Sequence, residues 1–313
     1  MPNAPCPLQL RPVLIIGGTH GNERTGPWII GRCKADPLLL GPAAPPVDHV
    51  IGNPAAVARN RRYLERDLNR CFTPELLEDP TDSSVEVRRA RTLLEQLGPA
   101  GAEPHQLVID LHTTTASMGA CLVLGGRRPT DLALAACAQE QCGLPIYIYE
   151  SDPCETGFLV NGWPCAVTIE VGPVAQGIVD PLVAEQTLET LRVVLACATS
   201  IANGSRKAPE RVLVHGHITG LDLPKDAQGN PIASIHPERA RRDWQAIGPG
   251  APLFLGADDV VYRYSGAEVV YPVFINEAAY GEKGIAMNLA RRETLTIQPE
   301  WLDAVRKLML QGA

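Results

Sequence analysis

The stretch VLIIGGTHGNE, residues 13–23, constrains the fold and the chemistry of this chain more than any other. Its apolar run predicts a short buried strand, and the glycines that follow predict a turn at the strand end. His20 and Glu23 lie on that turn, where an imidazole nitrogen and a carboxylate oxygen can both reach one metal ion. The alternative is a polar loop that holds a histidine and a glutamate by chance.

A catalytic zinc needs a third protein ligand and an open position for water. The segment LVIDLHTTT offers His112 directly after an apolar strand. Asp110 lies two residues earlier, so strand alternation places it on the same face. Such a carboxylate commonly anchors the second ring nitrogen of a metal-bound histidine. We therefore expect His112 as a ligand with Asp110 behind it, although a histidine that merely caps the strand end is the alternative.

Glu170 lies within the apolar run VTIEVGP, where an unpaired carboxylate is costly. Beside a zinc site it would be well placed as the general base for a water molecule. A structural ion pair with one of the arginines is the alternative.

An arginine-rich segment, residues 53–72, precedes the strand that carries His112. Most of its charges fit a solvated face, but Arg62 and the tetrad DLNR (residues 67–70) are candidates for a functional role. An amide beside a guanidinium can hold a carboxylate in a fixed orientation. We expect Asn69 and Arg70 to bind a substrate carboxylate in this way.

The segment VHGHITG places His215 and His217 at alternate positions of an expected strand. Two imidazoles on one strand face can resemble a pair of metal ligands. They lie far in sequence from any cluster of carboxylates, so we favour a structural role for both.

Strand-like and helical segments alternate up to about residue 205, which indicates a mostly parallel sheet covered by helices. One of the helices is expected after Ser83 and Glu86, which have capping-box spacing. Later segments are short and β-like, separated by Gly, Pro and Asp turns. We expect a catalytic α/β domain at residues 1–205 and a smaller β-rich domain at residues 206–313.

The 313-residue chain is 45% hydrophobic and 20% charged, with a net charge of −7. This acidic balance argues against nucleic acid or an anionic membrane as a partner. No apolar run approaches the ~18–20 residues of a membrane span, and the N-terminal residues lack the apolar core of a signal peptide. Nine cysteines without CxxC pairs argue against a disulfide framework. We therefore expect a cytoplasmic protein.

Five sequence blocks follow one another in the chain: GGTHGNE, NPAAV with RYLERDLNR, DLHTTTASMG, IEVGP with a following QG, and YPVFINEAAYGEK. Together they resemble the aspartoacylase family, a branch of the succinylglutamate desuccinylase and aspartoacylase group of zinc deacylases. The matching blocks run from residue 13 to residue 283. The resemblance implies a zinc-carboxypeptidase-like α/β fold, with helices on both faces of the sheet and a β-rich C-terminal domain that shields the site.

The resemblance also implies roles for single residues. The family's zinc ligands, for one ion per chain, are matched by His20, Glu23 and His112. Its general base is matched by Glu170, and the arginine that polarises the scissile carbonyl by Arg62. Its substrate-contacting positions are matched by Asn69, Arg70, Tyr280 and Lys283. Glu277, in the same block as Tyr280, is interpreted as structural, and the resemblance further suggests a homo-oligomer.

One departure concerns the side chain of the substrate. Aspartate-specific members of the family carry an arginine that grips the side-chain carboxylate, and here Val160 lies at that position, ten residues before Glu170. Residues 151–168 contain no Arg or Lys at all. Either another residue supplies the charge, with Lys283 as the leading candidate, or the enzyme accepts a different amino acid.

We expect a zinc-dependent amidohydrolase that removes a short acyl group from an N-acyl amino acid, with N-acetylaspartate as the leading substrate. Glu170 would take a proton from the attacking water and pass it to the leaving amine, while zinc and Arg62 stabilise the oxyanion. The alternatives are a deacylase that prefers aromatic or aliphatic amino acids, a metallocarboxypeptidase, and a non-catalytic zinc- or carboxylate-binding protein. A carboxypeptidase needs an open groove, and a binding protein needs no Glu170.

Overall fold

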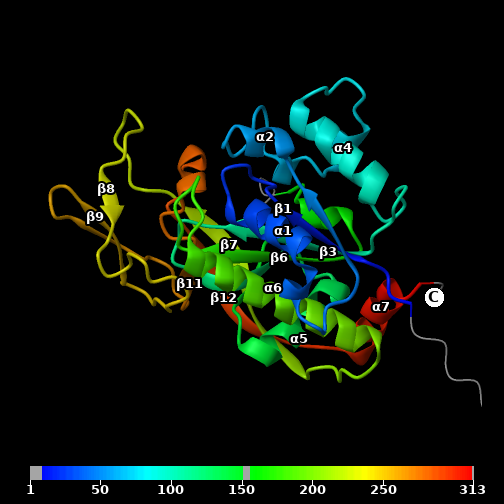
Figure 1. The fold of residues 1–313 in the computed structure, drawn as a ribbon. Coiled ribbons are helices and arrows are strands. Elements are labelled where there is room, and N and C mark those ends of the chain that lie inside the picture. Colours follow the sequence, from blue (N-terminus) through cyan, green and yellow to red (C-terminus); the bar gives the residue numbers. More distant parts are fainter. Residues whose placement is uncertain (1–8, 151–155, 312–313) are drawn as a thin grey trace, which may run out of the picture.

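The computed structural model describes residues 9–150 and 156–311 of the chain. Residues 1–8, 151–155 and 312–313 lie outside the described part, and residues 151–155 begin the arginine-free stretch. A nine-stranded sheet forms the centre of the molecule (Figure 1). Its strands lie in the order β11-β12-β7-β5-β4-β6-β3-β1-β2. Its strands are β1 (Val13–Gly17), β2 (Val47–Ile51), β3 (Leu107–Thr113), β4 (Gly119–Leu124), β5 (Ile146–Ile148), β6 (Cys165–Gly172), β7 (Arg211–Leu221), β11 (Tyr271–Val273) and β12 (Met287–Thr296).

Helices cover both faces of this sheet, as expected from the sequence. One face carries α1 (Thr25–Ala35), α5 (Pro129–Cys142), α6 (Pro181–Ala202) and α7 (Pro299–Met309). The other face carries α4 (Val85–Leu97) and the short 3₁₀ turns η2 (Leu68–Arg70) and η3 (Leu159–Gly162). The remaining short elements are η1 (Pro37–Leu40), α2 (Pro54–Ala58), α3 (Pro74–Glu78) and η4 (Ala278–Lys283). None of the helices in the described ranges is both long enough and apolar enough to span a membrane.

The centre of the sheet is mostly parallel. β1 pairs in parallel with β2 and β3, and β3 with β6, whereas β4 runs antiparallel to β6. Alternate residues of β1 enter two different cores: Val13 and Ile15 face α1, while Leu14 and Ile16 face α4. Because both faces are covered, the strand consists of an unbroken apolar run. The predicted mostly parallel α/β sheet is confirmed.

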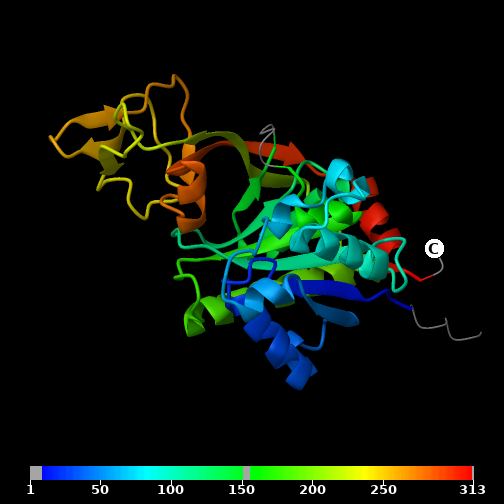
Figure 2. The same cartoon turned by 90° about the horizontal axis from the view of Figure 1, so that it is seen from above.

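The segments after residue 205 contribute to two sheets. β7, β12 and β11 continue the nine-stranded sheet as an antiparallel edge. The second sheet is antiparallel and consists of β8 (Ala233–Ile235), β9 (Pro252–Gly256) and β10 (Val261–Arg263). It projects from one end of the main body, drawn in yellow and orange in Figure 2. A smaller β-rich C-terminal unit is thus present, and the division into residues 1–205 and 206–313 stays a prediction.

The predicted capping box of Ser83 and Glu86 is wrong. Helix α4 begins at Val85, and its N-cap residue Ser84 makes no side-chain hydrogen bond to the helix. Glu86 is fully buried instead and accepts hydrogen bonds from the backbone N–H groups of residues 64–66 and from the side chain of Asn53. A buried carboxylate needs several donors. Here the donors come from a distant loop, which the local spacing could not indicate.

Candidate metal and active site

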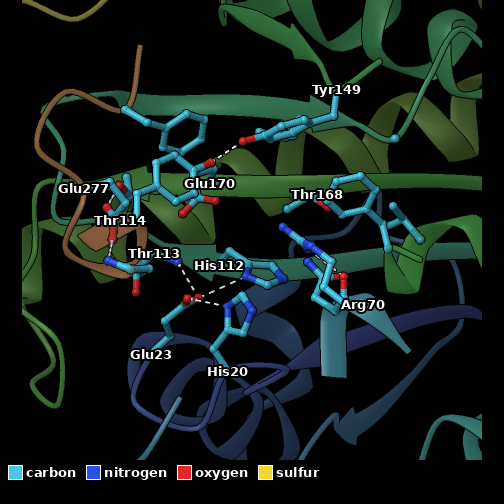
Figure 3. Close-up of a pocket in the computed structure, with 18 of the residues that line it drawn as sticks. His20, Glu23, Arg70, His112, Thr113, Thr114, Tyr149, Thr168, Glu170 and Glu277 are labelled. Atoms are coloured by element: carbon cyan, nitrogen blue, oxygen red, sulfur yellow. Dashed lines mark hydrogen bonds and ion pairs between the residues drawn. The ribbon is translucent and has the colours of Figure 1, made fainter. Parts of the chain in front are cut away.

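His20, Glu23 and His112 converge at the carboxyl ends of two neighbouring parallel strands. The first two lie on the turn after β1, and His112 is the sixth residue of β3. Glu23 lies between the two rings: its Oε1 is 2.5 Å from His20 Nδ1, and its Oε2 is 3.0 Å from His112 Nδ1 (Figure 3). One ligand atom from each of the three residues lies within 4.8 Å of the others, and all three side chains are buried.

The second nitrogen of each ring is held by an outer carboxylate. His112 Nε2 lies 2.7 Å from Asp110, as the sequence predicts, and Asp110 also accepts a hydrogen bond from Thr19. His20 Nε2 lies 3.1 Å from Asp67, a partner that the sequence reasoning missed. Because the Nε2 side of each ring is held by a carboxylate, Nδ1 is the nitrogen left on each ring to bind a metal ion.

The electrostatics of the three residues suit a divalent cation. Burial alone would raise the pKa of Glu23, but the charges of His20 and His112 hold it below its usual range. Burial would lower the pKa of His112, but Asp110 and Glu23 raise it well above its usual range. Two imidazoles and one carboxylate form a common donor set for catalytic zinc, which leaves a fourth position open. The residues present therefore fit a zinc ion.

Glu170 lies directly beside the metal ligands. β3 and β6 pair so that His112 and Glu170 are opposite each other, which places both at one edge of the cavity (Figure 3). Burial raises the pKa of Glu170 well above its usual range, the negative charge of Glu23 raises it further, and the cations His112 and Arg62 oppose the shift. Glu23 and Glu170 thus have their pKa values moved in opposite directions, which favours one as a ligand and the other as a proton carrier.

Arg62 follows α2 and is held by two acidic side chains. Its Nη2 lies 3.1 Å from Asp67, and its Nη1 lies 3.4 Å from the metal-site carboxylate Glu23. Burial lowers the pKa of Arg62, but the charges of Asp67 and Glu23 outweigh that effect and raise it. The guanidinium is therefore fixed at the wall of the cavity, with its charge kept.

Asn69 and Arg70 belong to η2 and line the same cavity as the metal ligands. The backbone N–H of Leu159 donates to Asn69 Oδ1 at 2.7 Å, and Arg70 Nη1 donates to the backbone oxygen of Asn69 at 2.6 Å. The Arg70 guanidinium lies over the ring of Phe158, 4.6 Å from its centroid. The sequence did not indicate Phe158, since nothing in its neighbourhood marks it as a partner of Arg70.

The C-terminal part of the chain reaches the cavity through η4. Tyr280 is buried there, and its hydroxyl is hydrogen-bonded to that of Tyr149, which also lines the cavity. Lys283 is exposed, with Nζ 5.7 Å from the Tyr280 ring centroid, and does not belong to the cavity lining. Its predicted contact with a substrate carboxylate stays a prediction.

Glu277 ties η4 to the loop that follows His112. One oxygen, Oε2, accepts hydrogen bonds from the hydroxyls of Thr114 and Thr115 and from the backbone N–H groups of Thr115 and Ala116. The other, Oε1, accepts the N–H of Ala279 at 3.0 Å. This single side chain therefore fixes the segment that carries Tyr280 into the cavity lining.

One cavity joins the metal ligands with Glu170, Arg70 and Tyr280. The lining also includes apolar side chains, namely Val123, Leu124, Phe158 and Val160. Val160, at the position where the resemblance leads one to look for an arginine, is 5% exposed and faces this cavity.

His215 and His217 do not form a metal site with any carboxylate in the described structure. His217 Nδ1 lies 2.7 Å from the Tyr147 hydroxyl, and His215 packs against the ring of Trp244. In the described ranges, a group of three or more potential ligands occurs only at His20, Glu23 and His112.

Comparison with known proteins agrees with this site. Residues 9–198 match the model described as the succinylglutamate desuccinylase/aspartoacylase catalytic domain, and residues 210–292 match the AstE/AspA barrel-sandwich hybrid domain. A protein of Prochlorococcus marinus (strain MIT 9313), named probable aspartoacylase, is 48% identical over 95% of this chain and 98% of its own length. A probable aspartoacylase of Synechococcus sp. (strain CC9605) is also 48% identical, over 95% of this chain and 97% of its own length.

Solved structures of similar fold include members of the same group of proteins. Murine aminoacylase 3 superimposes with a TM-score of 0.81 at 31% identity, over 94% of this chain and 98% of the murine chain. The succinylglutamate desuccinylase of Chromobacterium violaceum, at 18% identity and a TM-score of 0.57 over 91% of this chain and 86% of its own, shares the fold. The chain belongs to the succinylglutamate desuccinylase/aspartoacylase family.

Proposed function

We propose that this protein hydrolyses the amide bond of an N-acyl amino acid, using one zinc ion per chain held by His20, Glu23 and His112. The observation that carries the proposal is the position of Glu170, a carboxylate beyond the three ligands, which lies opposite His112 and faces the same cavity. When bound, the zinc ion would polarise the acyl carbonyl and make a water molecule more acidic.

The chain's own residues then have distinct tasks. Glu170 takes the proton of the attacking water and hands it to the leaving amine nitrogen, and a raised pKa suits this second step. Arg62, fixed by its two acidic neighbours, donates to the carbonyl oxygen as negative charge develops there. Asn69 and Arg70 bind the α-carboxylate that every N-acyl amino acid carries. Tyr280 contributes to the wall of the cavity from η4.

The two other classes of function explain the geometry less well. A non-catalytic zinc-binding protein has no use for a buried carboxylate beside the open coordination position. A metallocarboxypeptidase requires a groove for a peptide, whereas η4, anchored by Glu277, brings Tyr280 into the lining of the cavity that holds the metal ligands. The arrangement therefore supports a small substrate.

N-acetylaspartate is our leading substrate. The relatives at 48% identity carry the name probable aspartoacylase, and this name supports the assignment. The second carboxylate of this substrate needs a cation near its side chain, and Lys283 is our candidate. A lysine is a flexible point charge without the planar fork of arginine, so the preference for aspartate should be shallow.

A second candidate is an N-acyl amino acid with an aliphatic or aromatic side chain. It is favoured by the apolar wall that Phe158 and Val160 contribute to the cavity. An apolar side chain placed there would be stabilised by burial, and it would need no second cation.

The experiment is a panel of N-acetyl amino acids incubated with zinc-loaded protein, with release of the free amino acid as the readout. We expect N-acetylaspartate to have the highest kcat/KM. Lys283→Met should lower kcat/KM for N-acetylaspartate and leave kcat/KM for N-acetylleucine unchanged. A clear preference for N-acetylleucine or N-acetylphenylalanine would instead establish the second candidate. Release of no amino acid from any member of the panel would refute the deacylase proposal.

Assembly and location are further proposals. We expect a homo-oligomer in the cytoplasm, with the small substrate as the ligand and neither nucleic acid nor membrane as a partner. Size-exclusion chromatography with light scattering tests the first of these statements, and a monomer at micromolar concentration would contradict it.

A further inference from the structure

Phe158 lies under the cation that the proposed function assigns to the α-carboxylate. The Arg70 guanidinium carbon is 4.6 Å from the centroid of the Phe158 ring. The same ring packs against Tyr149, with the two centroids 5.3 Å apart. Phe158 is only 8% exposed, and both Phe158 and Arg70 line the cavity beside Thr168 and the metal site (Figure 3 labels Arg70 and Thr168).

The backbone locks the segment of Phe158 to the segment of Arg70. The N–H of Phe72 donates to the carbonyl of Gly157 at 3.1 Å, and the N–H of Leu159 donates to Asn69 Oδ1 at 2.7 Å. Gly157 has a φ of +74°, and a Cβ at this position would lie 2.8 Å from the carbonyl oxygen of Arg70. The chain therefore passes so close to η2 at this point that only glycine fits. These contacts lie on both sides of Phe158 and fix where its ring can be.

A ring face under a guanidinium restricts the plane of that group. Arginine has a long side chain with much rotational freedom, and a carboxylate is bound well only when both N–H groups of the fork point at it. Stacking on an aromatic face attracts the cation and also holds its plane before the ligand arrives. The Arg70 side chain then loses its rotational freedom in the free protein, so this entropy cost no longer weakens substrate binding.

We propose that Phe158 is a positioning residue, which holds the plane of the Arg70 guanidinium so that its fork meets the α-carboxylate of the substrate. This inference rests on the proposed function for the identity of the ligand. It predicts that Phe158 acts on substrate binding, through Arg70, and contributes little to the chemical step.

An ordinary core phenylalanine is the competing explanation, and the chain offers a matched control. Phe72 is 7% exposed, and its ring packs against Trp163, with the centroids 6.2 Å apart. It does not belong to the lining of the cavity. Phe72→Leu therefore removes a ring of equal size and burial without touching Arg70.

The kinetic test compares three variants with zinc-loaded wild type. Phe158→Leu should raise KM for every N-acetyl amino acid by roughly 2- to 30-fold, the usual worth of a cation–π contact, and leave kcat within about twofold. Phe158→Tyr keeps the ring face and should restore KM, and Phe72→Leu should leave KM unchanged. A fall in kcat with an unchanged KM in Phe158→Leu, or an equal rise of KM in both leucine variants, would overturn the inference.

A double-mutant cycle shows whether the effect passes through Arg70. In an Arg70→Ala background, the further change Phe158→Leu should alter KM by less than about twofold, because the group that the ring positions is gone. If Phe158→Leu raises KM by the same factor in both backgrounds, the two residues act independently and the inference is wrong.

A spectroscopic readout keeps the test separate from catalysis. The ring current of Phe158 should shift the Nε–Hε resonance of Arg70, which is assigned by its disappearance in Arg70→Lys. This shift should vanish in Phe158→Leu and persist in Phe72→Leu. A resonance that Phe158→Leu does not move would overturn the inference even if the panel shows no hydrolysis, whereas a lost shift with no hydrolysis would refute only the proposed function.

Discussion

The two sides of the cavity are assembled over very different distances along the chain. His20 and Glu23 lie three residues apart on one turn, and His112 joins them from the neighbouring parallel strand. We call these three residues and Asp110 the metal side. We call residues 273–283 the rim, which Glu277 ties to a loop more than 160 residues earlier.

The two sides also keep their buried carboxylates in different ways. On the metal side, Glu23 lies against two imidazoles and the guanidinium of Arg62, so at least one fixed cation faces this carboxylate. At the rim, hydroxyl groups and backbone N–H groups donate to Glu277, and the N–H of Ile275 donates to Asp243. Neutral donors compensate a buried charge less completely than a cation does. We infer that the metal side provides the chemistry. The rim closes the cavity, and the burial of its carboxylates lowers the stability of the folded protein.

The largest expected effect comes from breaking the metal side. His20→Ala or His112→Ala removes one of three ligands, so zinc affinity and hydrolysis should both be lost. Metal analysis of the purified variants, together with the panel assay, checks this. His236→Ala, which removes a histidine remote from the site, should keep both properties. Full zinc content in the two ligand variants would show that the ion is held elsewhere.

A smaller effect is expected from breaking the rim. In Glu277→Gln the amide oxygen can replace Oε2, but the amide NH₂ then faces the N–H of Ala279. One partly buried donor is left unsatisfied, which should lower the free energy of unfolding by about 1–3 kcal/mol and lower kcat/KM at full zinc occupancy. Denaturant unfolding and metal analysis give the two readouts.

The control for this change is Glu268→Gln. Glu268 forms an exposed ion pair with Arg291, and such pairs contribute little to stability. We expect wild-type unfolding and activity in that variant. Equal stability of the two glutamine variants would mean that Glu277 is not an anchor of the rim.

The last expected effect is a pH dependence from Asp243, which accepts the N–H of the rim residue Ile275. Burial raises the pKa of Asp243 to about 6, against the opposing N–H of Ile275. Because the folded state holds this proton more tightly than the unfolded state, stability falls as pH rises from about 4 to about 6 and then stays lower, by at most about 3 kcal/mol. Asp243→Asn should therefore gain in Tm over wild type more at pH 8 than at pH 5. The same difference in Tm at both pH values would contradict the assignment.

The metal side could be predicted from the sequence because its signals are local. Turn residues after an apolar strand place His20 and Glu23, and the period of two along β3 places Asp110 behind His112. The parallel pairing of β1 with β3 then follows from the alternation of strands and helices. The structure confirms the convergence of His20, Glu23 and His112.

The rest of the site depends on contacts that no local pattern encodes. Asp67 supports His20 across 47 residues, and Phe158 reaches Arg70 only because two loops are locked together. Glu86 has the right spacing for a capping box, but it accepts hydrogen bonds from backbone N–H groups of a distant loop instead. Spacing rules describe neighbours along one element, and these side chains have partners on other elements.

The most direct test of the central claim is the rate of amino acid release by Glu170→Gln, measured at the same zinc occupancy as wild type. This variant keeps the shape of the side chain and all three ligands, and it removes only the proton acceptor. We predict unchanged zinc content and a kcat lower by at least ~10², the usual worth of general acid–base catalysis. A kcat close to that of wild type would contradict the account and return Glu170 to a structural role.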